Sequence, residues 1–369
     1  MLDDEIVKNL LSRIFGLFSE QDETTVVPLS KSQRGSITHI IILDGTLSRL
    51  DKGYETNAGL AYLLLKEATT KNTTSLYYEP GLQWKHWGGA LRVMTGSGLA
   101  DQIRRAYGAI ASRYRPGDRI IFLGYSRGAF AVRSLAGAID LIGLVKAEHA
   151  TERNIKQAWR LYRDGPNTKA AKAFAAAYCH EAAPIEMMGV WETVKSLGIV
   201  LPFFWRLSQP KYAFHNDQLG KSIANGFHAL AIDERRVAFS PVLWRCPPNW
   251  QGHLEQVWFK GVHGDIGGHV DDFADARPLA NIPLVWMLER LEMCGVDLPE
   301  NWRASYPQDV SAPSLGMNRS FGKFFWMRRR RIIGQDISEA KHASLDITVL
   351  APDKSQGLLH RFFRPQRRE

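Results

Sequence analysis

Short apolar runs alternate along this chain with longer segments whose apolar residues recur at helical spacing. The runs that predict strands are 37–43, 75–78, 119–123, 184–191 and 256–262. The segments that predict helices are 56–69, 98–114, 129–142, 151–178, 219–230 and 281–294. Such alternation is typical of an α/β fold, with a mostly parallel central sheet and helices on both faces.

Residues 124–128 fit the pattern G-x-S-x-G, which forms a sharp turn between a strand and a helix in α/β-hydrolases. They lie between the predicted strand 119–123 and the predicted helix 129–142, so Ser126 stands at the apex of the turn. Glycine is needed where strand and helix approach closely, because a Cβ atom would collide there. We interpret Ser126 as a catalytic nucleophile; the alternative is a serine that caps a helix.

Four chemically useful residues stand just past the ends of predicted strands: Asp44, Ser126, Glu192 and His263. In an open α/β sheet the ligand site lies beyond the carboxyl ends of the strands. A serine hydroxyl becomes a good nucleophile when a histidine takes its proton and an acid orients that histidine. The order Ser, acid, His along the chain is that of α/β-hydrolases, so we predict the triad Ser126, Glu192 and His263.

The acid remains open among three carboxylates. Glu192 is favoured, with Asp233 and Asp265 as rivals, and Asp265 can also be interpreted as a brace for the loop of His263. For His263 the alternative is a histidine that satisfies a strand-end hydrogen bond. His228 lies in the predicted helix 219–230 and is interpreted as a core histidine.

The oxyanion hole of an acyl-transfer enzyme needs two backbone N–H donors. One is expected from Arg127, the residue after the nucleophile, and the other from Gly45 or Thr46 in the loop after the first strand. Asp44 would brace that loop through side-chain hydrogen bonds. A metal role for Asp44 with Asp265 is an alternative, but no metal or cofactor is expected.

The chain has 369 residues, 45% of them hydrophobic, and no linker rich in Pro, Gly or Ser divides it. We predict one catalytic domain elaborated by insertions over residues 31–300. Residues 1–30 are expected to form an amphipathic helix and linker, the helix packing on the domain or docking to a partner or membrane. Residues 301–369 are expected to form a basic extension on or beside the domain.

The net charge of +9 would suit binding to either of two anionic partners, nucleic acid phosphates or anionic lipid headgroups. Part of the excess lies in the arginine run 328–331, which directly follows the bulky apolar residues 324–327. This combination suits a membrane interface, although a buried aromatic turn with a solvated arginine face is also consistent. We expect peripheral contact with an anionic membrane and no binding to nucleic acid.

Several features bear on location. No stretch of about 18 apolar residues predicts a membrane-spanning helix. The first residues are acidic where a secretory signal is basic. The three cysteines Cys179, Cys246 and Cys294 lie far apart, as packed thiols of a reducing compartment do. We expect a cytoplasmic location in the producing cell.

Taken together, these motifs resemble the catalytic domain of type VI secretion phospholipase effectors of the first lipase class, formerly an uncharacterised α/β-hydrolase domain. The pieces that carry the resemblance follow the family's order and lie at residues 43–46, 114–118, 124–129, 190–194, 228–235 and 261–268. The family usually has aspartate where this chain has Glu192, and glutamate serves as the triad acid in some α/β-hydrolases. The loop usually reads His-Ser-Asp, and here residues 263–265 read His-Gly-Asp.

The resemblance implies an α/β-hydrolase fold, ester hydrolysis through an acyl-enzyme, and phospholipid substrates. It also implies export by a contact-dependent secretion system, while the sequence identifies no immunity or chaperone partner. One alternative keeps the triad and changes the substrate: a soluble carboxylesterase, thioesterase or acyltransferase that acts on a small acyl ester. Another is a pseudohydrolase that uses its basic surface for binding.

Overall fold

The structure is a computed structural model that describes residues 35–68, 73–81, 97–194, 219–246, 250–319 and 327–345. The predictions that lie outside the described residues are the N-terminal helix and linker, the apolar residues 324–326 and the end of the basic extension.

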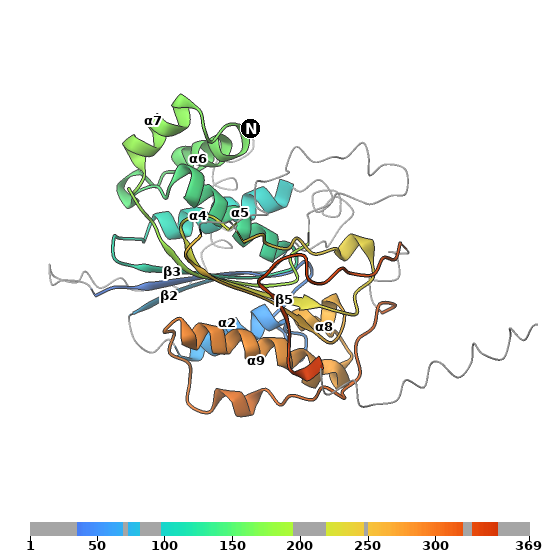
Figure 1. Cartoon of the computed structure of the whole chain (residues 1–369). Helices are drawn as coiled ribbons and strands as arrows, with labels where there is room; N and C mark the ends of the chain where they lie inside the picture. The colour runs from blue at the N-terminus through green and yellow to red at the C-terminus, as the bar shows by residue number, and fades with distance from the viewer. Residues whose placement is uncertain are drawn as a thin grey trace, which may run out of the picture. The chain divides into compact units, whose positions relative to one another are not determined.

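A parallel sheet forms the centre of the described part of the chain, with the strand order β2-β1-β3-β4-β5-β6-β7 (Figure 1). Its strands are β1 (Thr38–Leu43), β2 (Thr74–Glu79), β3 (Arg119–Tyr125), β4 (Ile185–Trp191), β5 (Ile223–Ala231), β6 (His253–Phe259) and β7 (Glu339–Lys341). Continuous apolar runs such as Ile40–Leu43 suit strands that are buried on both faces. The parallel sheet with helices on both faces confirms the predicted α/β class.

Helices cover both faces of the sheet (Figure 1). One layer contains α4 (Ser97–Ala111), α5 (Arg127–Ile142), α6 (Glu152–Asp164) and α7 (Lys169–Tyr178). The other contains α2 (Asn57–Ala68), α8 (His263–Gly267) and α9 (Arg277–Met293). Short 3₁₀ turns lie at Ala147–His149, Val237–Phe239, Ala274–Ala276 and Trp302–Ser305.

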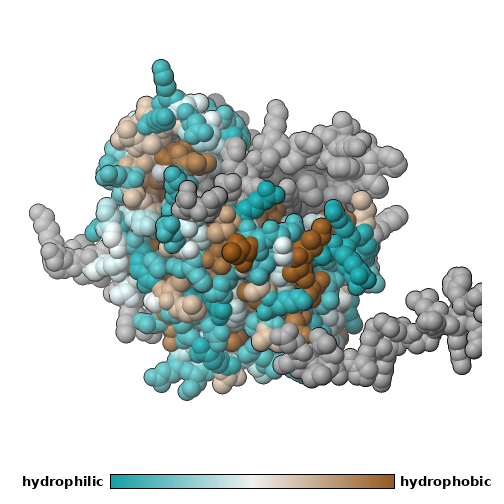
Figure 2. Space-filling model, viewed as in Figure 1, coloured by the Kyte–Doolittle hydropathy of each residue, from teal (hydrophilic) through white to brown (hydrophobic). Residues whose placement is uncertain are grey.

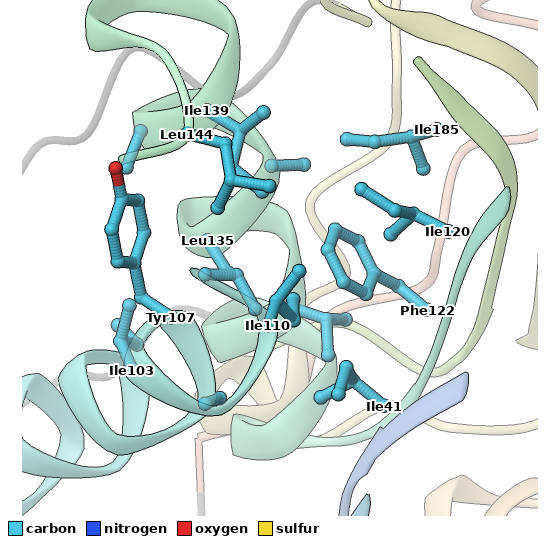
Figure 3. Packing of buried hydrophobic residues seen from close by; sticks show 14 of the residues in the cluster. Ile41, Ile103, Tyr107, Ile110, Ile120, Phe122, Leu135, Ile139, Leu144 and Ile185 are labelled. Atoms are coloured by element: carbon cyan, nitrogen blue, oxygen red, sulfur yellow. The ribbon is translucent and has the colours of Figure 1, made fainter. Parts of the chain in front are cut away.

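Neighbouring residues of one strand pack against opposite helical layers, because successive side chains point to opposite faces of the sheet. Ile41 joins the core under α4 and α5, whereas Ile40 and Ile42 join the core under α2 and α9. Figure 3 shows the first of these cores, in which Phe122 from β3 faces Leu135 from α5. These two cores hold the sheet rigid beneath the loops at its carboxyl edge.

The prediction of a helix at 219–230 is wrong, because most of this segment forms β5 in the middle of the sheet. Phe227 and Ala229 join the core under α9, while Leu230 and the buried His228 do not belong to that cluster. The short segment fits both helical spacing and strand alternation, and pairing with β4 and β6 selected the strand.

Other boundaries also differ from the sequence prediction. The single helix expected at 151–178 is broken at Gly165 into α6 and α7, and the side chain of Thr168 caps the second helix. The strand expected at 256–262 ends earlier, at Phe259, so that His263 is the first residue of α8 rather than a strand-end residue. Part of the predicted basic extension joins the sheet as β7.

Candidate active site

Ser126 lies in a sharp, strained turn between β3 and α5. Its φ of 56° and ψ of −113° are unusual for a residue with a side chain. A Cβ atom at Gly124 would lie 2.7 Å from Ala129 Cα, and one at Gly128 would lie 2.0 Å from Leu43 O. Both glycines are therefore required by the close approach of the turn to its neighbours, as a nucleophile elbow demands.

A chain of hydrogen bonds joins the serine, the histidine and the glutamate. Ser126 Oγ lies 3.0 Å from His263 Nε2, and His263 Nδ1 lies 3.2 Å from Glu192 Oε2. An ionised carboxylate can only accept hydrogen bonds, so the proton of a neutral His263 resides on Nδ1. Nε2 is then free to accept the proton of the Ser126 hydroxyl.

The environment of His263 favours its neutral, basic form. Burial lowers the pKa of His263, and this outweighs the opposing effects of Glu192 and Glu234. The imidazole is flanked by the rings of Tyr125 and Phe239, whose centroids lie 5.1 and 4.6 Å from its own. The base therefore stays unprotonated at a lower pH than an ordinary histidine does.

Glu192 directly follows β4 and is completely buried, with a positive φ of 49°. Its Oε1 accepts a hydrogen bond of 2.7 Å from the N–H of Ala231, and both carboxylate oxygens accept bonds of 2.7 Å from Arg331. Burial by itself would raise the pKa of Glu192, but the charge and hydrogen bonds of Arg331 together with His263 hold it far below its usual range. Glu192 is thus an ionised carboxylate whose orientation is fixed on both oxygens.

Arg331 contacts the candidate site, and the sequence interpretation did not single it out. Its guanidinium also donates to the backbone carbonyls of Ala231, at 2.6 Å, and Phe239, at 2.7 Å. The segment before it is held by backbone hydrogen bonds to the loop after β5, among them Arg329 N to Arg235 O at 2.7 Å. A run of four arginines carries no signal to show which of them turns inward, so the sequence left residues 328–331 as one basic cluster.

Glu234 is a second residue to which the sequence assigned no role. Its Oε2 accepts a hydrogen bond of 3.2 Å from the backbone N–H of His263 and forms an ion pair of 2.5 Å with the guanidinium of Arg236. The guanidinium of Arg236 lies over the ring of Phe239, which in turn packs on the His263 imidazole. This pair therefore supports both the backbone and the ring of the histidine.

Asp233 and Asp265, the rivals for the acid, are engaged elsewhere. Asp233 accepts the N–H of Gly261 at 2.8 Å. Asp265 accepts the N–H of Val262 at 2.8 Å and further bonds from residues 314 and 315. The structure brings Glu192 to the histidine side chain and places the two aspartates as braces of the loop that carries it.

The loop after β1 lies against the turn that carries Ser126. A Cβ atom at Gly45 would lie 2.6 Å from the ring of Tyr125 and 3.5 Å from Ser126 Cβ. The N–H of Gly45 is engaged by Asp44 Oδ1 at 2.6 Å. Thr46 Oγ1 is buried and has no hydrogen-bond partner within the described part of the chain. Of the two predicted oxyanion donors in this loop, the N–H of Gly45 is therefore already engaged.

Asp44 itself is buried, and both of its carboxylate oxygens accept hydrogen bonds. Besides the N–H of Gly45, it accepts the hydroxyls of Thr56 at 2.6 Å and Tyr78 at 2.7 Å. Burial raises its pKa despite these bonds. Asp44 has the contacts of a residue that braces the loop, and no cluster of three or more metal-ligating side chains occurs among the residues that the structure describes.

His228 is a buried residue that holds the turn after Glu192. Its Nε2 accepts the N–H of Thr193 at 3.2 Å, and its Nδ1 lies 3.4 Å from Gln256 Oε1. Burial first, and then the nearby charge of Arg133, lower its pKa to about 3, so the ring is neutral. These contacts are those of a core histidine.

The chain matches the model of one protein family. The family described as "T6SS, Phospholipase effector Tle1-like, catalytic domain" matches residues 38–290. The chain belongs to this family. The match contains Ser126, Glu192 and His263 of the Tle1-like domain and ends before Arg331. Membership supports a lipase or phospholipase-type function, and no helix in the described ranges is long and apolar enough to cross a bilayer.

The individual proteins that this chain resembles share little sequence identity with it. An uncharacterised protein of Saccharomyces cerevisiae is 27% identical over an alignment of 252 residues, and the match covers 61% of this chain and 35% of that protein. An uncharacterised protein from Pseudomonas aeruginosa has a solved structure with 15% identity and a TM-score of 0.42, covering 85% of this chain and 55% of that one. The Tle1 effector bound to the VgrG spike of the type 6 secretion system has 18% identity and a TM-score of 0.34, covering 68% and 56%. The chain spans about a third of the yeast protein's length.

Proposed function

We propose that this domain is a serine hydrolase that cleaves acyl esters of phospholipids, as a phospholipase A does. The observation that carries the proposal is the continuous hydrogen-bonded chain from Ser126 Oγ through the His263 imidazole to the Glu192 carboxylate. Family membership supports the choice of a phospholipid over other esters.

In the proposed reaction, Ser126 Oγ attacks the acyl carbonyl carbon while its proton passes to His263 Nε2. The carbonyl oxygen becomes an oxyanion, which the backbone N–H of Arg127 and the Thr46 N–H and hydroxyl would stabilise. The tetrahedral intermediate collapses when His263 returns the proton to the leaving alcohol, here the lysophospholipid. Water, activated by the same histidine, then hydrolyses the acyl-enzyme and releases the fatty acid.

Arg331 acts in this scheme as a positioning residue. It touches neither the substrate nor the reacting atoms, but it fixes both oxygens of Glu192 and so the orientation of the His263 ring. Its charge also offsets part of the attraction between Glu192 and a protonated His263. Both effects favour an enzyme whose base is oriented and neutral.

Replacing Arg331 with glutamine should lower kcat by about 10- to 100-fold, because groups that orient a catalytic side chain from behind have effects of this size. Without the guanidinium, the full charge of Glu192 would act on His263 and raise the pKa of the histidine. The low-pH fall in kcat/KM, which reports protonation of the free enzyme's base, should therefore move to higher pH. Steady-state kinetics on a soluble ester from about pH 5 to about pH 9 would measure both effects.

Arg330→Gln is the matched control, since Arg330 is the exposed neighbour of Arg331. Arg331→Lys keeps the charge but loses the bidentate geometry, so it should restore the pH profile more than kcat. Removing one partner of a buried ion pair costs about 3–5 kcal/mol, and a thermal melt must show that the variant is folded. A folded Arg331→Gln enzyme with unchanged kcat and pH profile would contradict the positioning role.

The substrate class is tested with vesicles of mixed phospholipids. The purified protein should release free fatty acid and lysophospholipid in equal amounts, which mass spectrometry detects and which identify the ester position that is cleaved. Hydrolysis of short p-nitrophenyl esters without any lipid turnover would instead identify the alternative, a soluble esterase, thioesterase or acyltransferase. Inertness toward both substrates would favour the pseudohydrolase.

Family membership also supports the proposal that the producing cell delivers this domain by contact-dependent secretion. Detection of the protein in recipient cells, lost when the donor's secretion apparatus is inactivated, would test this proposal. Retention in the donor under both conditions would contradict it.

A further inference from the structure

We infer that residues 327–337 form a docking surface for an anionic phospholipid bilayer; this inference rests on the proposed function. The structure describes eight large hydrophobic side chains as exposed, and four of them lie in this stretch. They are Met327, 59% exposed, Ile332, 57%, Ile333, 37%, and Ile337, 93%. Half of the exposed large hydrophobic residues that the structure describes thus fall within eleven consecutive residues, and this concentration motivates the inference.

The same stretch carries a strong positive charge. Arg328, Arg329 and Arg330 are exposed and lie between Met327 and the isoleucines. Arginines beside apolar side chains match the two layers of a membrane surface, anionic headgroups outside and acyl chains beneath. A nucleic acid would account for the arginines alone, because its phosphates offer nothing to an isoleucine side chain. The combination therefore favours an anionic membrane.

The apolar side chains project from a braced loop. Glu339 accepts the backbone N–H groups of Gly334, Gln335 and Asp336 at 2.7–2.9 Å. Asp336 in turn accepts the N–H of Cys246 at 2.9 Å. These bonds hold the loop against the sheet while Ile337 stays outside, so its exposure is built into the fold.

The docking surface is anchored directly to the candidate active site. Arg331, in the middle of the stretch, turns inward to Glu192 while its neighbours stay exposed. In Figure 1 the red segment that leads into β7 crosses the visible face, and Figure 2 shows brown side chains among teal ones on that face. Arg331 therefore joins this stretch to the carboxyl edge of the sheet, where Ser126 lies, and the chain then runs along β6 to the start of β7.

The test measures vesicle binding by the full chain with Ser126→Ala, so that the lipid is not hydrolysed. Vesicles of phosphatidylcholine with phosphatidylglycerol are compared with pure phosphatidylcholine by co-sedimentation. Neutralising the three exposed arginines by Arg328→Gln, Arg329→Gln and Arg330→Gln should weaken binding to the anionic vesicles by at least about tenfold. Ile332→Ser with Ile337→Ser should weaken it by about tenfold as well.

Matched controls remove the same charge and a similar apolar side chain elsewhere. Arg153→Gln, Lys169→Gln and Lys172→Gln neutralise three exposed residues of α6 and α7, and Met293→Ser removes a side chain that is 65% exposed. Binding that the controls weaken as much as the test variants would overturn the docking surface. So would binding that a polynucleotide competes for more strongly than anionic lipid, or equal binding to both vesicles.

Activity measurements can refute the docking surface and the proposed function independently of each other. In the background that retains Ser126, both sets of test variants should keep their activity on a soluble short-chain ester while losing activity on anionic vesicles. Selective loss of vesicle activity supports docking. Vesicle binding that depends on these residues, without any lipid hydrolysis, would preserve the docking surface and refute the phospholipase.

Discussion

Replacing Ser126 with alanine should lower kcat for ester hydrolysis by about 10⁴- to 10⁶-fold, because the nucleophile of a triad cannot be replaced by its neighbours. The hydroxyl sits 3.0 Å from His263 Nε2, and its loss removes the covalent route altogether. Activity should be measured on both phospholipid vesicles and a soluble ester. A fluorophosphonate should label the parent protein on the peptide that contains Ser126 and leave the alanine variant unlabelled.

Ser134→Ala is the matched control, since Ser134 is a buried serine of the helix that follows Ser126, and its hydroxyl donates to Phe130 O at 2.9 Å. It should change kcat by less than about tenfold, an upper bound for a residue outside the reacting groups. Labelling of another serine, or equal activity of Ser126→Ala and the parent protein, would reject the proposed nucleophile.

Replacing Glu192 with glutamine should lower kcat by about 10⁴-fold, by analogy with the loss of the triad carboxylate in serine proteases. A neutral amide cannot stabilise a protonated His263, and it no longer selects the tautomer with the proton on Nδ1. The substitution also leaves the guanidinium of Arg331 without its carboxylate partner, so the melting temperature should fall. Steady-state kinetics at matched folded fractions would separate the two effects.

The comparison with the rival acids decides the role of Glu192. Asp233→Asn and Asp265→Asn disturb only the loop of His263, so each should cost less activity than Glu192→Gln by at least about tenfold. Glu192→Asp keeps the charge opposite Arg331 but shortens the reach to Nδ1, and we expect intermediate activity with a smaller loss of stability. A larger loss of kcat in a folded Asp233→Asn enzyme would assign the acid there instead.

Much of the candidate site could be predicted from short segments of the sequence. The elbow at residues 124–128 is a contiguous pattern, because the close contacts that demand Gly124 and Gly128 arise within one turn and its nearest strand. Ser126 and Glu192 could be placed directly after strands, because each is a polar residue at the end of an apolar run. Parallel strands bring their carboxyl ends to one edge, so these predictions needed no knowledge of the strand order.

The choice between strand and helix at 219–230 required the whole sheet. A short segment with apolar residues at mixed spacing satisfies both periodicities, and only pairing with β4 and β6 selects the strand. The same pairing places His228 beneath the turn after Glu192. Its buried, bonded state was predicted, but its partners across the sheet were not.

Local patterns in the sequence predicted the α/β class, the sharp turn at Ser126 and the three candidates Ser126, Glu192 and His263, because each prediction used only the residues that flank it in the chain. The packing of distant segments brings Glu192 rather than Asp233 or Asp265 to His263, and it turns one arginine of four inward to hold Glu192. Arg331 lies 139 residues after Glu192. A pairing over that separation depends on how the sheet and the C-terminal segment pack, which no local pattern encodes.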